Sequence, residues 1–244
     1  MAVIGVIPSR WGSTRFPGKP LTPILGRPLV LWVIEAVKRA KRLDRVLVAT
    51  DDERIRDAIG DACEVVMTAS DLPSGTDRVA VAANAQPDDI VINIQGDEPL
   101  MDPALIDALA ERMIRTGEEM ATAACPIQTM ENLMAKTVVK VILRSDDSAI
   151  YFSRLPIPCR RDGEPDLASG LYWRHLGIYA YRGDFLAQLI KTPPCVLETT
   201  ESLEQLRALW LGGRIGVIRC HDEGVGVDTP ADVEVVEKLL LKRL

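Results

Sequence analysis

The chain has 244 residues, with 29 basic and 35 acidic side chains and a formal net charge of −6 at pH 7. This length can bury a full hydrophobic core without disulfides or metal ions, and the acidic balance argues against a general surface for nucleic acid or anionic membranes. Five scattered cysteines include no C-x-x-C pair, so the sequence indicates neither a disulfide framework nor a zinc site. No apolar run approaches the ~18 residues of a membrane span, and the start lacks a basic n-region. We therefore expect a cytoplasmic protein with no membrane insertion and no nucleic-acid partner.

Strand-like and helix-like patterns alternate through the first half of the chain. Apolar runs predict buried strands at residues 2–7, 45–50, 63–68, 89–94 and 120–127. Amphipathic segments predict helices at residues 28–40, 51–60, 74–85 and 103–116. Alternation at this spacing is typical of an α/β fold with a doubly wound, mostly parallel sheet.

The pattern becomes β-rich in the second half. Residues 137–158 indicate two adjacent strands around an "SDD" turn, followed by a loop at 158–170 and a further strand at 171–182. The chain then continues with helical segments at 183–191, 200–212 and 230–242 and a strand at 214–220. We interpret residues 1–244 as a single domain with an embedded β-rich insertion at about residues 130–182.

Positive charge is concentrated in the loop "RWGSTRFPGKPL" (residues 10–21), which follows the first predicted strand. It carries Arg10, Arg15 and Lys19, and no acidic residue precedes Glu35. Ligands of open α/β sheets bind at the carboxyl ends of the strands, where glycines let backbone N–H groups approach an anion. The spacing is not that of a Walker A loop, and no G-x-G-x-x-G follows the strand, which argues against a dinucleotide-dependent dehydrogenase. Three basic groups in an acid-free segment favour phosphate binding over a solvated surface loop.

An acidic motif follows the strand predicted at residues 89–94. Asp97 comes directly after this strand in "INIQGDEPL", where a carboxylate is well placed to hold Mg²⁺ beside a nucleotide phosphate. The alternative is a Gly-Asp turn in which Glu98 and Asp102 favour the start of the next helix. The spacing alone does not separate these two interpretations.

Two further motifs have a structural interpretation beside a functional one. Asp228, in "GVGVDTP", is a second candidate metal ligand, but Asp228 or Thr229 could instead cap the helix that follows. Sequence distance does not show whether Asp228 meets the first candidate ligand. Ser74 and Asp77, in "SGTDR", resemble a capping box, and a helix start after a loop can also bind a ribose hydroxyl or a base edge.

Arginine, histidine and tyrosine side chains gather in "YFSRLPIPCRR" and "HLGIYAYR". The cluster comprises Arg154, Arg160, Arg161, His175, Tyr179 and Tyr181. Such groups suit an anionic polyhydroxylated ligand, with arginine for a carboxylate and the others for hydroxyls. His175 also fits a hydrogen-bonded core residue. In the amphipathic helix "ESLEQLRALWLGG", Glu201, Glu204 and Gln205 are surface residues by default.

Taken together, these stretches resemble one family, the CMP-Kdo synthetases, or 3-deoxy-manno-octulosonate (Kdo) cytidylyltransferases. The family's pattern is visible, in order and over nearly the whole chain, as "IPSRWGSTRFPGKPL", "ATDD", "MTASDLPSGTDR", "INIQGDEPL", "YFSRLPIP", "HLGIYAYR", "LEQLRAL" and "GVDTP". The resemblance implies a nucleotidyltransferase-like α/β fold, with an insertion that usually helps to form a homodimer. It also implies transfer of CMP from CTP to the anomeric hydroxyl of Kdo, with release of pyrophosphate, for lipopolysaccharide assembly.

The family's functional residues can be placed on this sequence by matching position. The residues implied to bind the triphosphate are Arg10, Ser13, Arg15 and Lys19. Those implied to contact the cytidine are Ser74, Gly75 and Gln95. The sugar-acid pocket would be shaped by Arg154, His175, Tyr179, Glu204 and Gln205. By the same resemblance, Asp97 and Asp228 would hold Mg²⁺, while Lys19 and Arg15 would stabilise the departing pyrophosphate.

The sequence departs from the family's pattern at four positions. Ser9 and Trp11 replace the usual Ala and Tyr, Leu72 stands where His is common, and Val81 stands where Glu is usual. The changes in the first loop keep every charge, whereas Leu72 and Val81 remove polar groups near the expected substrate sites. They motivate one alternative, a cytidylyltransferase for another 2-keto sugar acid such as an amino-substituted Kdo or a sialic-type acid. A non-catalytic nucleotide-binding module is a more distant alternative.

Overall fold

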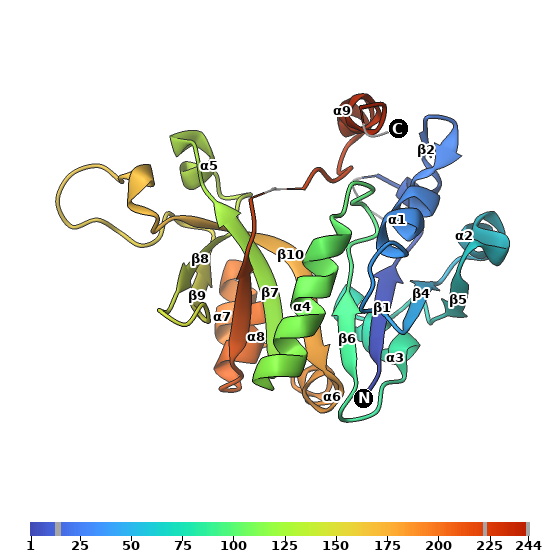
Figure 1. Ribbon diagram of the computed structural model, residues 1–244, viewed down its shortest axis with the longest axis horizontal. Helices are drawn as coiled ribbons and strands as arrows, with labels where there is room; N and C mark the ends of the chain where they lie inside the picture. Colours follow the sequence, from blue (N-terminus) through green and yellow to red (C-terminus); the bar gives the residue numbers. More distant parts are fainter. Residues whose placement is uncertain (13–15, 222–223, 243–244) are drawn as a thin grey trace.

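The computed structural model describes residues 1–12, 16–221 and 224–242 (Figure 1). Within these ranges one sheet of nine strands has the main path β11-β7-β10-β6-β1-β4-β5, and β8 and β9 extend it beside β10. The strands of the path are β1 (Val3–Pro8), β4 (Arg45–Thr50), β5 (Glu64–Met67), β6 (Ile90–Asn93), β7 (Met120–Pro126), β10 (Trp173–Arg182) and β11 (Ile215–Arg219). A separate short hairpin, β2 (Pro23–Ile24) and β3 (Arg27–Pro28), lies between the first loop and the first helix.

The sheet is mostly parallel, as the alternation of strands and helices predicts. The strand β1 pairs in parallel with both β4 and β6, β4 pairs in parallel with β5, and β11 pairs in parallel with β7. Only β10 on the main path runs the other way, between β6 and β7. The expected doubly wound α/β fold is therefore confirmed.

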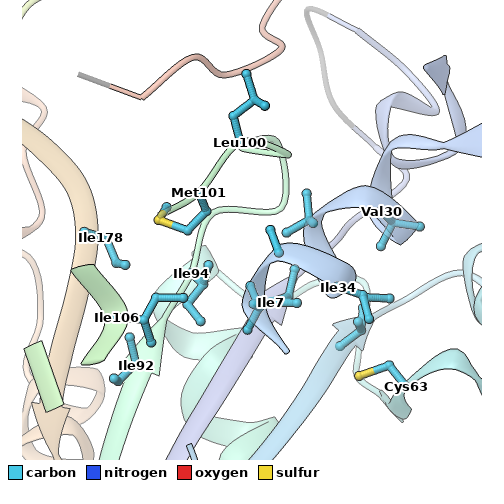
Figure 2. Packing of buried hydrophobic residues seen from close by; sticks show 14 of the residues in the cluster. Ile7, Val30, Ile34, Cys63, Ile92, Ile94, Leu100, Met101, Ile106 and Ile178 are labelled. Carbon is cyan, nitrogen blue, oxygen red and sulfur yellow. The ribbon is translucent and has the colours of Figure 1, made fainter. Parts of the chain in front are cut away.

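Helices cover both faces of the sheet because successive residues of each strand point to opposite sides. On β1, Val3 and Ile7 belong to one hydrophobic cluster, whereas Ile4 and Val6 belong to the other. Figure 2 shows part of the first cluster, in which Ile7 of the sheet lies near helix residues such as Ile34. Its helices are α1 (Leu29–Val37), α2 (Glu53–Ile59), α4 (Pro103–Thr116) and α9 (Pro230–Leu240). The second cluster is covered by α3 (Gly75–Ala83), α6 (Gly183–Lys191), α7 (Val196–Glu201) and α8 (Gln205–Trp210). No helix of the described ranges is both long and apolar enough to span a membrane.

The segment predicted as one helix at residues 200–212 is divided in the structure. Ser202 adopts a left-handed backbone conformation with φ of 53°, which ends α7. An α-helix cannot continue through such a residue, so α8 starts afresh at Gln205. The short helix α5 (Met130–Met134) was not predicted, and Thr129 caps its first turn.

The β-rich segment at residues 130–182 contributes to the central sheet as well as to a lateral lobe. In the lobe, β8 (Lys140–Leu143) and β9 (Ala149–Ser153) form an antiparallel hairpin, with α5 nearby and a long loop before β10 (Figure 1). Arg174 and Trp173 pair with β8, while the second half of β10 lies between β6 and β7. The boundary of the expected insertion thus falls within β10, because this one strand belongs to both parts.

Candidate active site

Three connected hollows lie along the edge of the sheet where β1 and β6 end. The first, named here the loop cavity, has a volume of about 380 Å³ and is lined by Pro8, Ser9, Arg10, Lys19, Pro20, Leu72, Pro73, Ser74, Gly75, Arg78, Gln95, Gly96, Asp97 and Glu204. The second, the sheet cavity, has a volume of about 420 Å³, and its polar lining residues include Thr76, Asn93, Gln95, Arg174, His175, Tyr179, Tyr181, Ser202, Glu204 and Gln205. The two share the wall formed by Pro8, Gly75, Gln95 and Glu204. Ligands in both cavities would therefore meet at this wall.

The third hollow, the carboxylate cavity, connects with both of the others. It is lined by Asp97, Glu98, Arg174, His175, Leu176, Gly177, Gly224, Val225, Gly226, Asp228 and Asp232. Asp97 also lines the loop cavity, and Arg174 and His175 also line the sheet cavity. Acidic groups are thus placed beside the junction of the loop and sheet cavities.

Lys19 brings the two candidate metal ligands together. Its Nζ lies 2.5 Å from Oδ2 of Asp97 and 3.5 Å from Oδ1 of Asp228. The backbone supports this arrangement, because the N–H of Val227 donates to the carbonyl oxygen of Asp97 at 2.8 Å. The segment before α9 therefore crosses the end of β6, and Asp228 is held beside Asp97 although 131 positions separate them in the sequence.

The structural alternatives for the two aspartates have different outcomes: Gly96 and Asp97 do form a turn before a helix that Asp102 caps, whereas Asp228 is not the cap of its helix. Thr229 caps α9 and forms a capping box with Asp232, so the side chain of Asp228 is not the cap. Likewise Asp102 caps α4 by accepting from the N–H of Ala104. The carboxylates of Asp97 and Asp228 therefore face the cleft without a role in starting a helix.

Glu98 adds a third carboxyl group to this region. Burial and then the nearby carboxylates of Asp97 and Asp228 raise its pKa to about 7. Across the described ranges no three His, Cys, Asp or Glu side chains converge as a complete metal cage. A cation bound here would therefore need oxygen ligands from a bound substrate or from water in addition to the protein carboxylates.

The first loop is braced where it begins and ends. The N–H of Gly18 donates to the carbonyl oxygen of Trp11 at 3.2 Å, and Gly18 has a φ of 70°, which favours glycine. The guanidinium of Arg54 lies 3.4 Å from the centroid of the Trp11 ring, a cation–π contact. Arg10 and Lys19 line the loop cavity from this brace. Ser13 and Arg15, the other residues expected to bind triphosphate, lie outside the described residues.

Gly96 lets the ends of β1 and β6 approach each other closely. A Cβ atom at this position would lie 2.7 Å from the carbonyl oxygen of Pro8 and 2.9 Å from Oγ of Ser9. Any larger residue would force the strands apart and displace Asp97. The glycine before the aspartate is thus required by packing at the site.

Ser74 uses its hydroxyl to start α3, as its sequence pattern predicts. It accepts from the N–H of Asp77 at 3.2 Å and donates to the carboxylate of Asp77 at 2.7 Å. Gly75 follows in the wall shared by the loop and sheet cavities. Thr76, which the sequence did not single out, donates to Glu204 at 2.7 Å and so joins α3 to the start of α8.

Gln95, Tyr179 and Gln205 all line the sheet cavity. The Nε2 group of Gln95 donates to the carbonyl oxygen of Gly177 at 2.7 Å, which fixes the orientation of its carboxamide. The hydroxyl of Tyr179 donates to Oε1 of Gln205 at 3.4 Å. Gln205 is only 4% exposed, so it is not the surface residue that its helical pattern suggests by default.

His175 is both a buried residue and part of the cavity wall. Its Nε2 lies 3.0 Å from Oγ1 of Thr122, and that hydroxyl is also 2.7 Å from the carbonyl oxygen of Ile178. We assign the hydroxyl proton to the shorter contact, so Thr122 accepts from the Nε2–H of the histidine. The ring packs against Phe152 and Tyr179, with centroid distances of 4.9 and 5.4 Å. Burial lowers the pKa of His175 to about 3, and the ring is therefore neutral near pH 7.

The buried state of His175 predicts a pH dependence of stability. Because its folded pKa is about 3 against an ordinary value of 6.5, its contribution is complete above pH 6.5 and is lost as the pH falls toward 3. Relative to the wild type, His175→Gln is expected to have a shallower slope of unfolding free energy against pH, by up to about 1.4 kcal/mol per pH unit. Chemical denaturation at pH steps between 4 and 8 measures this difference. Parallel curves for the two proteins would contradict it.

Arg154 does not reach the cavities. Its guanidinium donates to the backbone carbonyl oxygens of Glu201 at 2.7 Å, Lys136 at 3.1 Å and Ser202 at 3.1 Å. It therefore holds the turn between α7 and α8, one residue of which, Ser202, lines the sheet cavity. Arg174, which the sequence reasoning did not select, is the arginine in the wall of the sheet and carboxylate cavities.

The four departures from the family pattern lie in different surroundings. Ser9 and Leu72 line the loop cavity, and Trp11 lies in the brace described above. Val81 is 51% exposed on α3 and lines none of the three cavities. Among the four changes, Leu72 in place of the common His is therefore the one that removes a polar group from the wall of the loop cavity.

Comparison with known proteins agrees with this geometry. Residues 4–215 match the family described as Cytidylyltransferase. The chain belongs to the cytidylyltransferase family. A protein of Bdellovibrio bacteriovorus named 3-deoxy-manno-octulosonate cytidylyltransferase is 49% identical over 98% of both chains. One of the same name from Geobacter sulfurreducens is 46% identical over 98% of this chain and all of the other. The resemblance to CMP-Kdo synthetases is thereby confirmed.

A solved structure of a CMP-Kdo synthetase is similar to this chain over the whole fold. The structure of CMP:2-keto-3-deoxy-manno-octonic acid synthetase complexed with CTP superposes with a TM-score of 0.92 at 37% identity, covering all of both chains. A cytidylyltransferase from Leptospira borgpetersenii, with 18% identity and a TM-score of 0.66, shares the fold.

Proposed function

We propose that this protein transfers CMP from CTP to the anomeric hydroxyl of Kdo and releases pyrophosphate. The observation that carries the proposal is the meeting of Lys19, Asp97 and Asp228 beside two cavities that share one wall. Relatives that are 46–49% identical over 98% of this chain carry the name of this activity, and a similar solved structure contains CTP.

The two cavities suit the two substrates. The loop cavity offers Arg10 and Lys19 for a triphosphate and the start of α3 for the nucleoside. The sheet cavity offers neutral hydrogen-bonding groups for sugar hydroxyls, together with Arg174 for a carboxylate. The shared wall at Gln95 and Glu204 would bring the anomeric hydroxyl of the sugar acid to the α-phosphorus of CTP. Positioning of the two substrates would then supply a large part of the rate enhancement. Lys19 would then neutralise charge on the pyrophosphate as it leaves.

Mg²⁺ is part of the proposal, with Asp97 and Asp228 as its protein ligands. Two adjacent carboxylates without a complete cage match the way Mg²⁺ is held in nucleotide sites, by one or two carboxylates and substrate phosphates. Burial is the main cause of the raised pKa of Glu98, and the carboxylates of Asp97 and Asp228 raise it further, which places three carboxyl groups close to one another here. When bound, Mg²⁺ would offset charge on the phosphates and lower the pKa of a coordinated hydroxyl.

Three wider properties are proposed with the activity: a cytoplasmic location, a place in lipopolysaccharide synthesis and a homodimeric state. The homodimer is supported by apolar side chains exposed on the lateral lobe, where Met134 is 59%, Ile150 47% and Leu155 56% exposed. Such a group of side chains is typical of an interaction surface.

A pyrophosphate-release assay with each nucleoside triphosphate and a panel of 2-keto sugar acids tests the proposal. We expect turnover with CTP and Kdo above all other pairs. A preference for an amino-substituted Kdo or a sialic-type acid would favour the alternative that Leu72 motivates. Binding of CTP without pyrophosphate release from any sugar acid would overturn the proposed activity in favour of a nucleotide-binding module.

A further inference from the structure

A row of polar side chains crosses the centre of the sheet at the floor of the sheet cavity. Asn93, the last residue of β6, is in register with Val6 of β1 on one side and with Tyr179 of β10 on the other. Tyr179 is in turn in register with Thr122 of β7. Residues in register share a face of a sheet, so three polar side chains lie next to one another where apolar residues would ordinarily fill the core.

Two of the three polar side chains have partners, and the third does not. The hydroxyls of Thr122 and Tyr179 are hydrogen-bonded to Ile178 and Gln205, respectively. Asn93 is 4% exposed and lines the sheet cavity, yet among the described residues its Oδ1 has no hydrogen-bond partner. Leaving a buried acceptor unsatisfied destabilises the fold, so such atoms are rare unless something binds them.

The same cavity contains a complementary unpaired group. Within the described ranges the Nε2 of Gln205, also 4% exposed, has no acceptor, and its Oε1 is bound to the hydroxyl of Tyr179. The cavity thus presents one neutral acceptor, on Asn93, and one neutral donor, on Gln205. This pair suits neighbouring hydroxyl groups, each of which can donate and accept.

We propose that Asn93 is a specificity residue that accepts a hydrogen bond from a hydroxyl of the sugar acid through its Oδ1. The inference rests on the proposed function and assigns this side chain, which lies within "INIQGDEPL" but was given no role there, to the sugar-acid side of the site. The neutral amide of asparagine accepts a hydrogen bond from the hydroxyl and does not repel the carboxylate of the same substrate. An aspartate at this position would repel that carboxylate. Because a site built to bind a hydroxyl rejects an analogue that lacks it, Asn93 would help to choose among related sugar acids.

Direct binding tests the inference without turnover. The protein is saturated with a CTP analogue that cannot release pyrophosphate, and Kdo is titrated by calorimetry. Asn93→Leu, which keeps the approximate size and removes the acceptor, is expected to weaken Kdo binding by about 10-fold and to leave the binding of the CTP analogue within about twofold. Ser9→Ala provides a matched comparison, because Ser9 Oγ is likewise buried without a partner among the described residues but lines the loop cavity. Ser9→Ala is expected to leave the affinity for Kdo unchanged.

A panel of deoxy sugar acids separates recognition from mere support of the fold. One deoxy analogue should bind the wild type more weakly and should lose nothing further in Asn93→Leu, since the hydrogen bond is already absent. Equal Kdo affinity in wild type and Asn93→Leu would overturn the inference, as would equal losses for Kdo and every deoxy analogue. Should Asn93→Leu fail to fold, Asn93→Ala is compared in the same way. Wild-type turnover is assayed separately, so absence of turnover with intact Kdo binding would count against the proposed function and not against Asn93.

Discussion

Asp97→Asn is expected to lower kcat/KM for pyrophosphate release from CTP and Kdo by about 10²–10³-fold, the usual loss for one preorganised electrostatic contact. The change keeps the size of the side chain and removes the charge that faces Lys19 at 2.5 Å. It also removes one of the two carboxylates proposed to hold Mg²⁺, so binding of Mn²⁺ in the presence of CTP, followed by electron paramagnetic resonance, should weaken as well. Steady-state kinetics at saturating Mg²⁺ measures the first effect.

Asp102→Asn is the matched control for this variant. Asp102 lies five positions along the chain, caps α4 and lines none of the three cavities. Asparagine caps a helix about as well as aspartate, so this variant should keep wild-type kinetics. Turnover of Asp97→Asn within a few-fold of wild type would remove Asp97 from the proposed mechanism.

Lys19→Met is expected to reduce kcat/KM by a similar factor of about 10²–10³ for a different reason. The ammonium group lies between two carboxylates that would otherwise repel each other, and we propose that it offsets charge on the leaving pyrophosphate. Methionine keeps the unbranched shape and loses the charge. Lys19→Arg should recover part of the activity, because it restores the charge with a different geometry.

Lys38→Met serves as the control for loss of a lysine charge. The Nζ of Lys38 donates to the backbone of Ala62 on the exposed side of the molecule and takes no part in the cavities. Equal activity of Lys19→Met and Lys38→Met would show that Lys19 has no role in catalysis.

Local patterns predicted most of the elements, and long-range geometry accounts for what they missed. The run at residues 2–7 became β1, and the helix predicted at 103–116 has the bounds of α4, because apolar periodicity and caps are properties of neighbouring residues. The break at Ser202 was missed because serine rarely adopts a left-handed conformation, so nothing in its local pattern marks it.

In the candidate site, too, local patterns selected individual residues, and contacts between distant segments decided which of them lie together. The sequence selected Asp97 and Asp228 separately, and contacts between distant segments bring them together: the ion pairs of both with Lys19 and the hydrogen bond from Val227 to the backbone of Asp97. Arginine at position 154 fitted a carboxylate by chemistry alone, but three backbone carbonyls occupy its guanidinium. Asn93 escaped selection because its environment depends on strands β1 and β10, which come from distant parts of the chain.

The position of β10 has a consequence for the order in which the protein folds. The strands β1, β4, β5 and β6 all lie within the first 93 residues, so the nucleotide half of the sheet can pair soon after that part of the chain is made. β6 and β7, by contrast, remain unjoined until β10, ending at Arg182, enters between them. Closing such a long loop is entropically costly and slow. We therefore expect β7, β10 and β11 to acquire hydrogen-exchange protection later during refolding than β1, β4, β5 and β6.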